Sequence, residues 1–122
     1  MPYRVAISRR LAEILSVLAH PARLRIVEEL GHTELDVASL SRMLSISHSR
    51  TSQHLGQLRA HRLVEERREG RQVFYHLRNP GLARWLLEGL DVLESDADAT
   101  SEMKQQLQRA RAAWSLRQHP SP

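Results

Sequence analysis

The chain has 122 residues, 41% of them hydrophobic, with a formal net charge of +4 and no cysteine. That length lets one compact domain bury a core without disulfides, and the missing thiols exclude thiolate zinc sites, iron–sulfur clusters and cysteine chemistry. Residues 1–85 carry 14 basic and 8 acidic side chains, whereas residues 86–122 carry 4 and 6, so we expect the two parts to face different partners.

No apolar run approaches the roughly 18 to 20 residues that span a bilayer. The first residues also lack the apolar core of a signal peptide. We therefore expect a soluble cytoplasmic protein with no membrane partner.

The first half of the chain shows apolar residues at helical spacing in two segments before Gly31. The first helix is predicted over Ile7 to Leu18, and the second from Pro21 to Gly31, because proline suits the first helical position. The apolar faces are formed by Ile7, Leu11, Ile14, Leu15 and Leu18 in the first helix and Leu24, Val27 and Leu30 in the second.

Two further helices follow, each preceded by a residue that can cap its first turn. The third is predicted to start at the N-cap Asp36, and the fourth to run from the N-cap Ser47 to about His61. Their buried faces are predicted to hold Val37, Leu40, Met43 and Leu44 in the third helix and Thr51, Leu55 and Leu58 in the fourth.

The period then changes to that of a β-hairpin. Strands are predicted over Leu63 to Arg68 and Gln72 to Leu77, joined through Glu69-Gly70. A strongly apolar helix follows, carrying Leu82, Trp85, Leu86, Leu90 and Leu93. After a polar break at 95–99, a last helix carries Met103, Leu107, Ala110 and Trp114, and we expect the tail 119–122 to be disordered.

A pair of helices separated by a short break and followed by a hairpin is the outline of a winged helix-turn-helix. The predicted fold is mainly α with a small β-hairpin, in the order α-α-α-α-β-β-α-α. In such folds the second helix of the pair enters the DNA major groove.

The fourth helix presents a polar face opposite its buried one. Ser49 and Gln53 project from that face, with Arg50, Ser52 and Gln57 on its flanks and Gly56 leaving room for close approach. Glutamine can pair with adenine, and arginine with guanine or phosphate. Together with the hairpin arginines Arg67, Arg68 and Arg71, this face predicts DNA binding.

Three segments resemble the ArsR/SmtB family of bacterial winged-helix repressors. They are LAHPARLRI (residues 18–26), LSISHSRTSQHL (44–55) and, after Leu63-Val64, REGRQVFYHL (68–77). The resemblance implies a homodimer built on the first and fifth helices that represses transcription from a palindromic operator. It places the base-reading positions on His48, Ser49, Ser52 and Gln53 in the helix at about 48–61, and the wing at about 65–73.

Many members of that family sense metals, and the chain departs from them. The thiolate positions fall on Asp36 and Ala38, and the ligand positions of the fifth helix fall on Asn79, Gly81, Val92 and Ser95. This set cannot hold zinc. The seven histidines also lack any pair at i, i+3 or i, i+4 spacing, so we expect neither a metal site nor a cofactor, and the inducer stays unknown.

The apolar helices at both ends predict a dimer interface, since a small domain rarely exposes so much apolar surface. The residues expected there are Ile7, Leu11, Ile14, Leu86, Leu90 and Leu93. We expect residues 1–95 to form the DNA-binding and dimerisation domain, 96–117 a helix on the dimer interface, and 118–122 a tail. The alternative that the last helix packs within its own subunit stays open.

No catalytic motif is present: the chain has no G-x-S-x-G, H-E-x-x-H or phosphate-binding loop, so an enzyme is not expected. Two alternatives remain open. One is a winged-helix module that binds another protein and does not read DNA. The other is a DNA-binding metal sensor whose site is built of histidine and carboxylate ligands at new positions.

Overall fold

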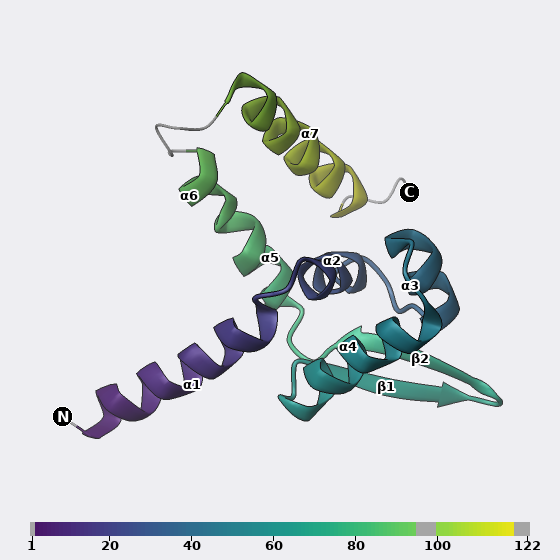
Figure 1. Ribbon diagram of the computed structural model, residues 1–122. Helices are drawn as coiled ribbons and strands as arrows, with labels where there is room; N and C mark the ends of the chain where they lie inside the picture. The colour runs from purple at the N-terminus through teal and green to yellow at the C-terminus, as the bar shows by residue number, and fades with distance from the viewer. Residues whose placement is uncertain (1, 95–99, 119–122) are drawn as a thin grey trace. The chain divides into compact units, whose positions relative to one another are not determined.

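Four helices and a β-hairpin form the first of two units in the computed structural model (Figure 1). The structure describes residues 2–94 and 100–118, with side chains through residue 112 except that of residue 94. The units are Met1–Pro80 and Gly81–Pro122. The first contains α1 (Pro2–Leu18), α2 (Pro21–Leu30), α3 (Val37–Leu44), α4 (His48–Ala60), β1 (Val64–Glu69) and β2 (Gln72–Leu77).

The core of the first unit lies where α2, α3 and α4 meet the base of the hairpin. Its fully buried apolar side chains are Ile26, Val27, Leu40, Leu55, Leu58 and Val64. The prediction of Thr51, Leu55 and Leu58 as the buried face of the fourth helix is confirmed. Met43, predicted to be buried on the third helix, is 44% exposed, and Val37 of the same predicted face is half-buried. Leu24, on the predicted apolar face of the second helix, is 41% exposed.

The first helix is longer than predicted and its apolar stripe is not covered. It begins at Pro2, a residue suited to a helix start, and only Val17 and Leu18 are buried. Ile7, Leu11 and Leu15 are 63%, 44% and 47% exposed. Helical periodicity identifies an apolar face but not what covers it.

Both predicted N-caps are present. The Asp36 carboxylate accepts a hydrogen bond from the Ser39 backbone N–H at 2.8 Å, and the Ser47 hydroxyl accepts one from the Arg50 N–H at 3.1 Å. Each side chain satisfies a donor that the first helical turn leaves unpaired. The cap at Ser47 therefore fixes the point where α4 starts.

The turn between α3 and α4 depends on a left-handed residue and a buried hydroxyl pair. Ser45 has φ 56°, and the Ile46 N–H reaches back to the Ser41 carbonyl at 3.2 Å. The Ser41 and Thr51 hydroxyls lie 2.8 Å apart and are buried, and the Thr51 hydroxyl also donates to the Ser47 carbonyl. This network fixes the angle at which α4 leaves α3.

The end of α4 turns directly into the hairpin. Arg62 has φ 60°, the Leu63 N–H bonds to the Leu58 carbonyl at 2.9 Å, and the Arg62 N–H bonds to the Arg59 carbonyl at 2.9 Å. This is the Schellman arrangement, in which glycine is the usual left-handed residue. Leu63 and Val64 are consequently buried beside α4.

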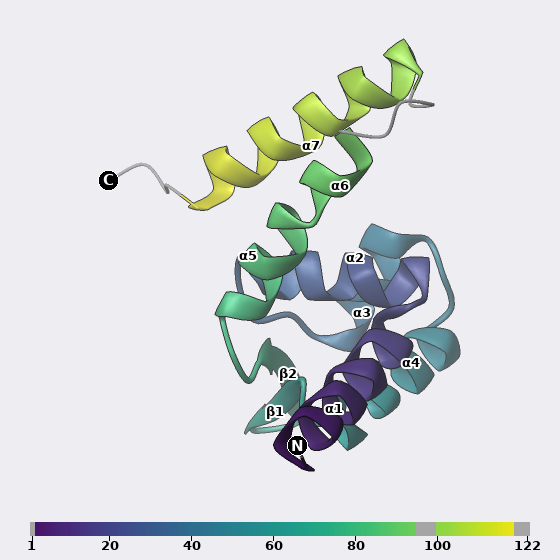
Figure 2. The same cartoon turned by 90° about the vertical axis from the view of Figure 1, so that its left-hand side faces the viewer.

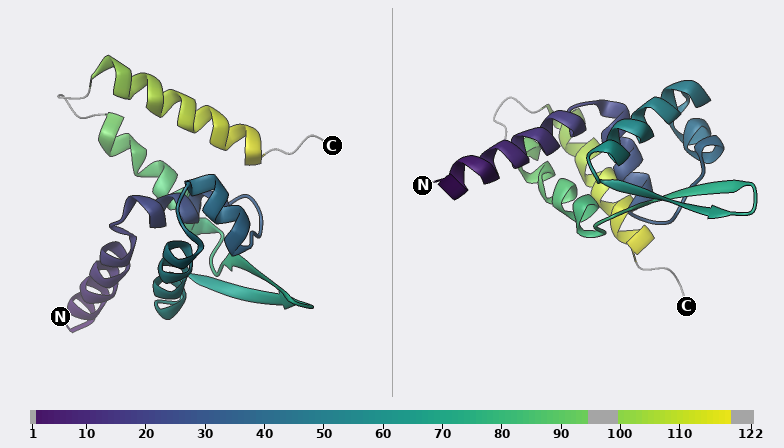
Figure 3. Two further views of the ribbon diagram at one scale, coloured as in Figure 1. Left: turned by 45° about the vertical axis from the view of Figure 1, so that its right-hand side comes forward. Right: turned by 90° about the horizontal axis from the view of Figure 1, so that it is seen from below.

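The hairpin is an antiparallel ribbon that extends from the helices, seen from two sides in Figures 2 and 3. Val64 pairs with Leu77 and Glu69 with Gln72, so the loop is Gly70-Arg71, one residue later than predicted. Gly70 has φ +61°, which glycine adopts without strain. A bridge between Leu35 and Tyr75 ties β2 to the segment before α3.

The second unit contains α5 (Gly81–Glu88), α6 (Leu90–Glu94) and α7 (Ser101–Gln118). The single helix predicted across Leu82 to Leu93 is wrong, because it breaks at Gly89. A Cβ at that position would lie 3.1 Å from the Leu86 carbonyl oxygen, and glycine is the residue least suited to a helix interior after proline. The order is therefore α-α-α-α-β-β-α-α-α.

Within the second unit, Arg111 of α7 pairs with Asp91 of α6, and Leu107 is buried. Two predictions lie outside the described residues: the polar break at 95–99 and the tail 119–122. The Trp114 side chain lies outside them as well, and the division into domains at residue 95 stays a prediction. None of the described helices is long and apolar enough to cross a membrane.

We predict that Asp36→Ala lowers the free energy of unfolding by about 1 kcal/mol, whereas Asp36→Asn, which keeps an acceptor, costs much less. Hydrogen bonds from the Ser39 hydroxyl and backbone hold the pKa of Asp36 below its ordinary value. The stabilisation by the charged form is thus present above about pH 4 and is lost as the pH falls through the lowered pKa.

Urea unfolding of the wild type and both variants between pH 7 and about pH 3 measures this. The difference between the wild type and Asp36→Asn should shrink as the pH falls. A wild type and Asp36→Ala of equal stability at pH 7 would show that the cap contributes nothing.

Candidate nucleic-acid interface

The polar residues predicted to read DNA lie together on the surface of α4. They are all exposed and comprise His48, Ser49, Arg50, Ser52, Gln53 and Gln57. Their positions are set by the buried side, since Thr51, Leu55 and Leu58 fix the rotation of the helix. A Cβ at Gly56 would meet nothing within 4 Å, so the middle of this face is open.

The two flanks of α4 have different neighbours within the first unit. On one flank, Arg59 forms an ion pair with Glu66 of β1 at 3.3 Å. On the other flank, Gln57 and His61 lie toward α1. The open polar face lies between the wing and α1. The major groove of DNA admits an α-helix, so an exposed helix face of this kind can enter it.

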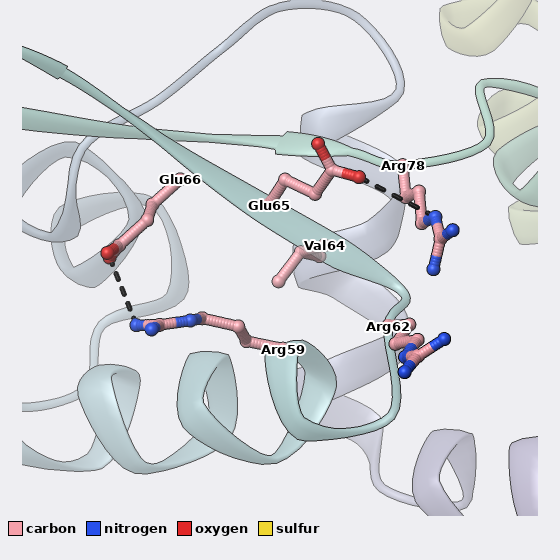
Figure 4. A pocket seen from close by; sticks show the side chains of 6 residues that line it. All are labelled: Arg59, Arg62, Val64, Glu65, Glu66 and Arg78. Carbon is pink, nitrogen blue, oxygen red and sulfur yellow. Dashed lines mark ion pairs between the residues drawn. The ribbon is translucent and has the colours of Figure 1, made fainter.

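Two ion pairs lie at the base of the wing: one joins β1 to α4, and the other joins β1 to the residue that follows β2 (Figure 4). Besides the Arg59–Glu66 pair, Glu65 lies 3.6 Å from Arg78, and the Val64 side chain between them is buried. Figure 4 shows the two pairs on opposite sides of Val64. These arginines are engaged at the base of the hairpin, away from its tip.

Arg67, predicted as a phosphate contact, is held by the protein itself. Its Nε and one terminal nitrogen lie 2.9 and 2.8 Å from a Glu34 carboxylate oxygen, and its other terminal nitrogen lies 3.0 Å from Glu69. The guanidinium also sits 5.0 Å from the centre of the Phe74 ring. The hydrogen bond from Arg67 holds the pKa of Glu34 below its ordinary value, and the same bond raises the pKa of Arg67.

Sequence reasoning missed Glu34, which is 33 residues from Arg67. The bridge between Leu35 and Tyr75 brings the two together across β2. No local pattern carries this signal, because the pairing is a product of tertiary structure.

Arg68 and Arg71 are the wing arginines that stay available. Arg68 is 75% exposed and reaches Glu66 only at 4.0 Å. Arg71 stands in the two-residue loop at the tip and is exposed, and within the described part of the chain it forms no ion pair. A guanidinium in this position can approach a phosphate without first breaking an internal contact.

His54 joins α4 to α2 on the buried side of the interface. Its Nδ1 accepts a hydrogen bond from the Arg23 Nε at 3.1 Å, and its ring lies 6.2 Å from that of His20. Burial lowers the pKa of His54, and the positive charges of Arg23, His20 and Arg50 lower it further. A neutral imidazole is the form that accepts this bond.

His76 lies between Glu34 and Glu65, with a ring nitrogen 3.6 Å from a carboxylate oxygen of each. Over residues 2–94 and 100–118, no group of three or more histidine or carboxylate side chains has an arrangement that could hold a metal ion.

A helix pair with a fixed turn, an exposed polar second helix and a hairpin with exposed arginines near its tip define a winged helix-turn-helix DNA-binding protein. Residues 20–66 match the model of the family described as "Bacterial regulatory protein, arsR family". The chain is 40% identical over 90 residues to the transcriptional repressor SmtB homolog of Synechocystis sp., covering 73% of this chain and 68% of that protein. The chain belongs to the arsR family, and it is a DNA-binding transcriptional repressor of that family.

Solved structures support the same fold. Reduced HlyU from Vibrio cholerae aligns with a TM-score of 0.67 at 33% identity, over 79% of this chain and 100% of that one. A homodimeric winged helix-turn-helix DNA-binding domain from Mycobacterium bovis aligns with a TM-score of 0.67 at 25% identity, over 78% of this chain and 88% of that one. The expectation of a regulatory protein, not an enzyme, is confirmed.

Proposed function

We propose that this repressor binds a palindromic operator as a homodimer and reads its sequence with α4. The observation that carries the proposal is the exposed polar face of α4, which is nearly free of acid and lies opposite a fully buried side. His48, Ser49, Ser52 and Gln53 face the base edges, and Arg50 and Gln57 lie on the flank nearer α1. Glutamine and serine supply the donors and acceptors that base edges require.

The wing contributes phosphate contacts through Arg68 and Arg71, which are exposed and close to the tip. Arg67 has a different role in this proposal. Its bonds to Glu34 and Glu69 fix the path of β1 relative to the segment before α3, so it positions the wing for the other two arginines.

The homodimer is supported by the apolar side chains that each unit leaves exposed. On α1 these include Ile7 and Leu11, and in the second unit Leu93 is 46% exposed while Leu86 and Leu90 are half-buried. Ile14 is half-buried on the same side of α1. An obligate interface on these residues would bury roughly 2,000 Å² or more and set two copies of α4 about 34 to 36 Å apart.

We predict that Gln53→Ala weakens binding to the cognate operator by about 1 to 3 kcal/mol and leaves binding to random DNA nearly unchanged, because it removes a base contact only. Gel-shift titration against the region upstream of the gene, with and without competitor DNA, measures both. A protein-binding module would show no preference for that region. Equal losses on operator and random DNA would remove Gln53 from the base contacts.

We predict that Arg71→Gln weakens binding to all DNA and flattens the dependence of log K on log salt by about one unit for each subunit, because one phosphate contact is lost. Arg67→Gln is the matched control: it should weaken binding without flattening the slope, and Glu34→Ala should reproduce its effect. A flatter slope in Arg67→Gln would place that guanidinium on a phosphate and overturn its positioning role.

We predict that Leu11→Glu converts the dimer to a monomer, because a charge at the centre of an apolar interface is not compensated there. Met43→Glu on α3, also 44% exposed, serves as the control and should leave the dimer intact. Sedimentation velocity measures both. If Leu11→Glu still forms a dimer and the two subunits associate with unchanged affinity, the dimer interface does not include the apolar stripe of α1.

A further inference from the structure

A shallow cavity of about 570 Å³, widely open to solvent, lies beside α4 in the first unit, between α1, the start of α2 and the end of α4. Arg9 and Ser16 line it from α1, His20 and Arg23 from the start of α2, and Gln57 and His61 from the end of α4. Its size falls in the range of sites for small organic ligands. None of the interactions described above fills it.

The cavity carries an excess of positive charge. Arg23 is half-buried, yet within the described part of the chain its hydrogen bonds go to neutral acceptors: its Nε donates to His54 Nδ1, and a terminal nitrogen donates to the Val17 carbonyl at 3.0 Å. Arg9 adds a second guanidinium. The one acidic residue in the lining, Glu13, lies 3.3 Å from Arg10, which partly neutralises it.

The neighbouring His54 reports the same excess. After burial, the largest cause that lowers the pKa of His54 is the positive charge of Arg23. A half-buried cation without a carboxylate partner favours an anion from solution.

The cavity also stays clear of the dimer stripe. At 100° per residue, Arg9 and Ser16 lie on the side of α1 opposite Ile7 and Leu11. Dimerisation through Ile7 and Leu11 therefore leaves the cavity open. Its far wall is Gln57, one turn from Gln53 on the DNA-reading helix.

We propose that this cavity binds a small organic anion, a carboxylate or phosphate ester, and that its occupation controls operator affinity. The control rests on the proposed function, whereas the binding does not. An anion held between Arg9 and Arg23 joins α1, which carries the dimer stripe, to the flank of α4. Linkage makes the coupling reciprocal: if the bound anion changes the affinity of the protein for DNA by some factor, bound DNA changes the affinity of the protein for the anion by the same factor.

Binding is tested by calorimetry on the full-length dimer without DNA, at constant ionic strength, with citrate, succinate, glycerol 3-phosphate and inorganic phosphate as probes. We expect saturable binding of at least one probe with a Kd below about 1 mM. Arg9→Gln should weaken it about tenfold through loss of one charged contact, whereas Arg42→Gln, which removes an exposed cation from α3, should not. No saturable binding, or equal losses in both variants, would overturn the site.

Control of DNA binding is tested by repeating the operator titration with the bound probe. We expect an operator Kd shifted several-fold in the wild type and unshifted in Arg9→Gln. If the probe binds while no operator is recognised, the site stands and the proposed function fails. If Arg9→Gln flattens the salt slope and the probe competes equally with all DNA, the cavity holds a DNA phosphate and the small-molecule proposal fails.

Discussion

The placement of α4, the helix that we propose to read DNA, depends on its packing against α2 and α3. Leu55 and Leu58 of α4 are buried. Nearer the turn that joins α3 to α4, the Ser41 and Thr51 hydroxyls form a hydrogen bond of 2.8 Å. A buried hydroxyl is costly without a partner, and two that satisfy each other allow only a narrow range of geometry. The apolar contacts stabilise α4, and the hydroxyl pair fixes its register, so the outward direction of Gln53 and Ser49 follows from this seat.

The charges of the first unit are divided between structure and recognition. Arg59, Arg78 and Arg67 are paired with glutamates at the base and middle of the hairpin, whereas Arg68 and Arg71 reach past them toward the tip. Pairing makes the wing a defined ribbon in place of a flexible one. Net charge alone therefore overstates the cations that are free to meet a nucleic-acid backbone.

The same division of charges underlies the proposal that the flank of α4 nearer α1 is a regulatory site. On the flank of α4 nearer the wing, the charge of Arg59 is neutralised by its ion pair with Glu66. On the α1 side Arg23 gives its hydrogen bonds to neutral acceptors, and an open cavity lies beside it. In the proposed scheme, DNA binds the open polar face of α4 and a partner subunit binds the apolar stripe of α1. An anion binds in the cavity between α1 and α4.

The sequence by itself determined where α2, α3 and α4 start, the hairpin and the buried face of α4, because caps, glycine turns and periodicity act within a few residues. It also located the polar residues of α4 that form the candidate site. Only the tertiary structure decided that Glu34 holds Arg67 and that Leu24 and Met43 are exposed. It also decided that Arg9, Arg23 and Gln57 line one cavity. These outcomes rest on contacts between residues distant in sequence or on competition between several apolar faces for one core, and no local pattern encodes either.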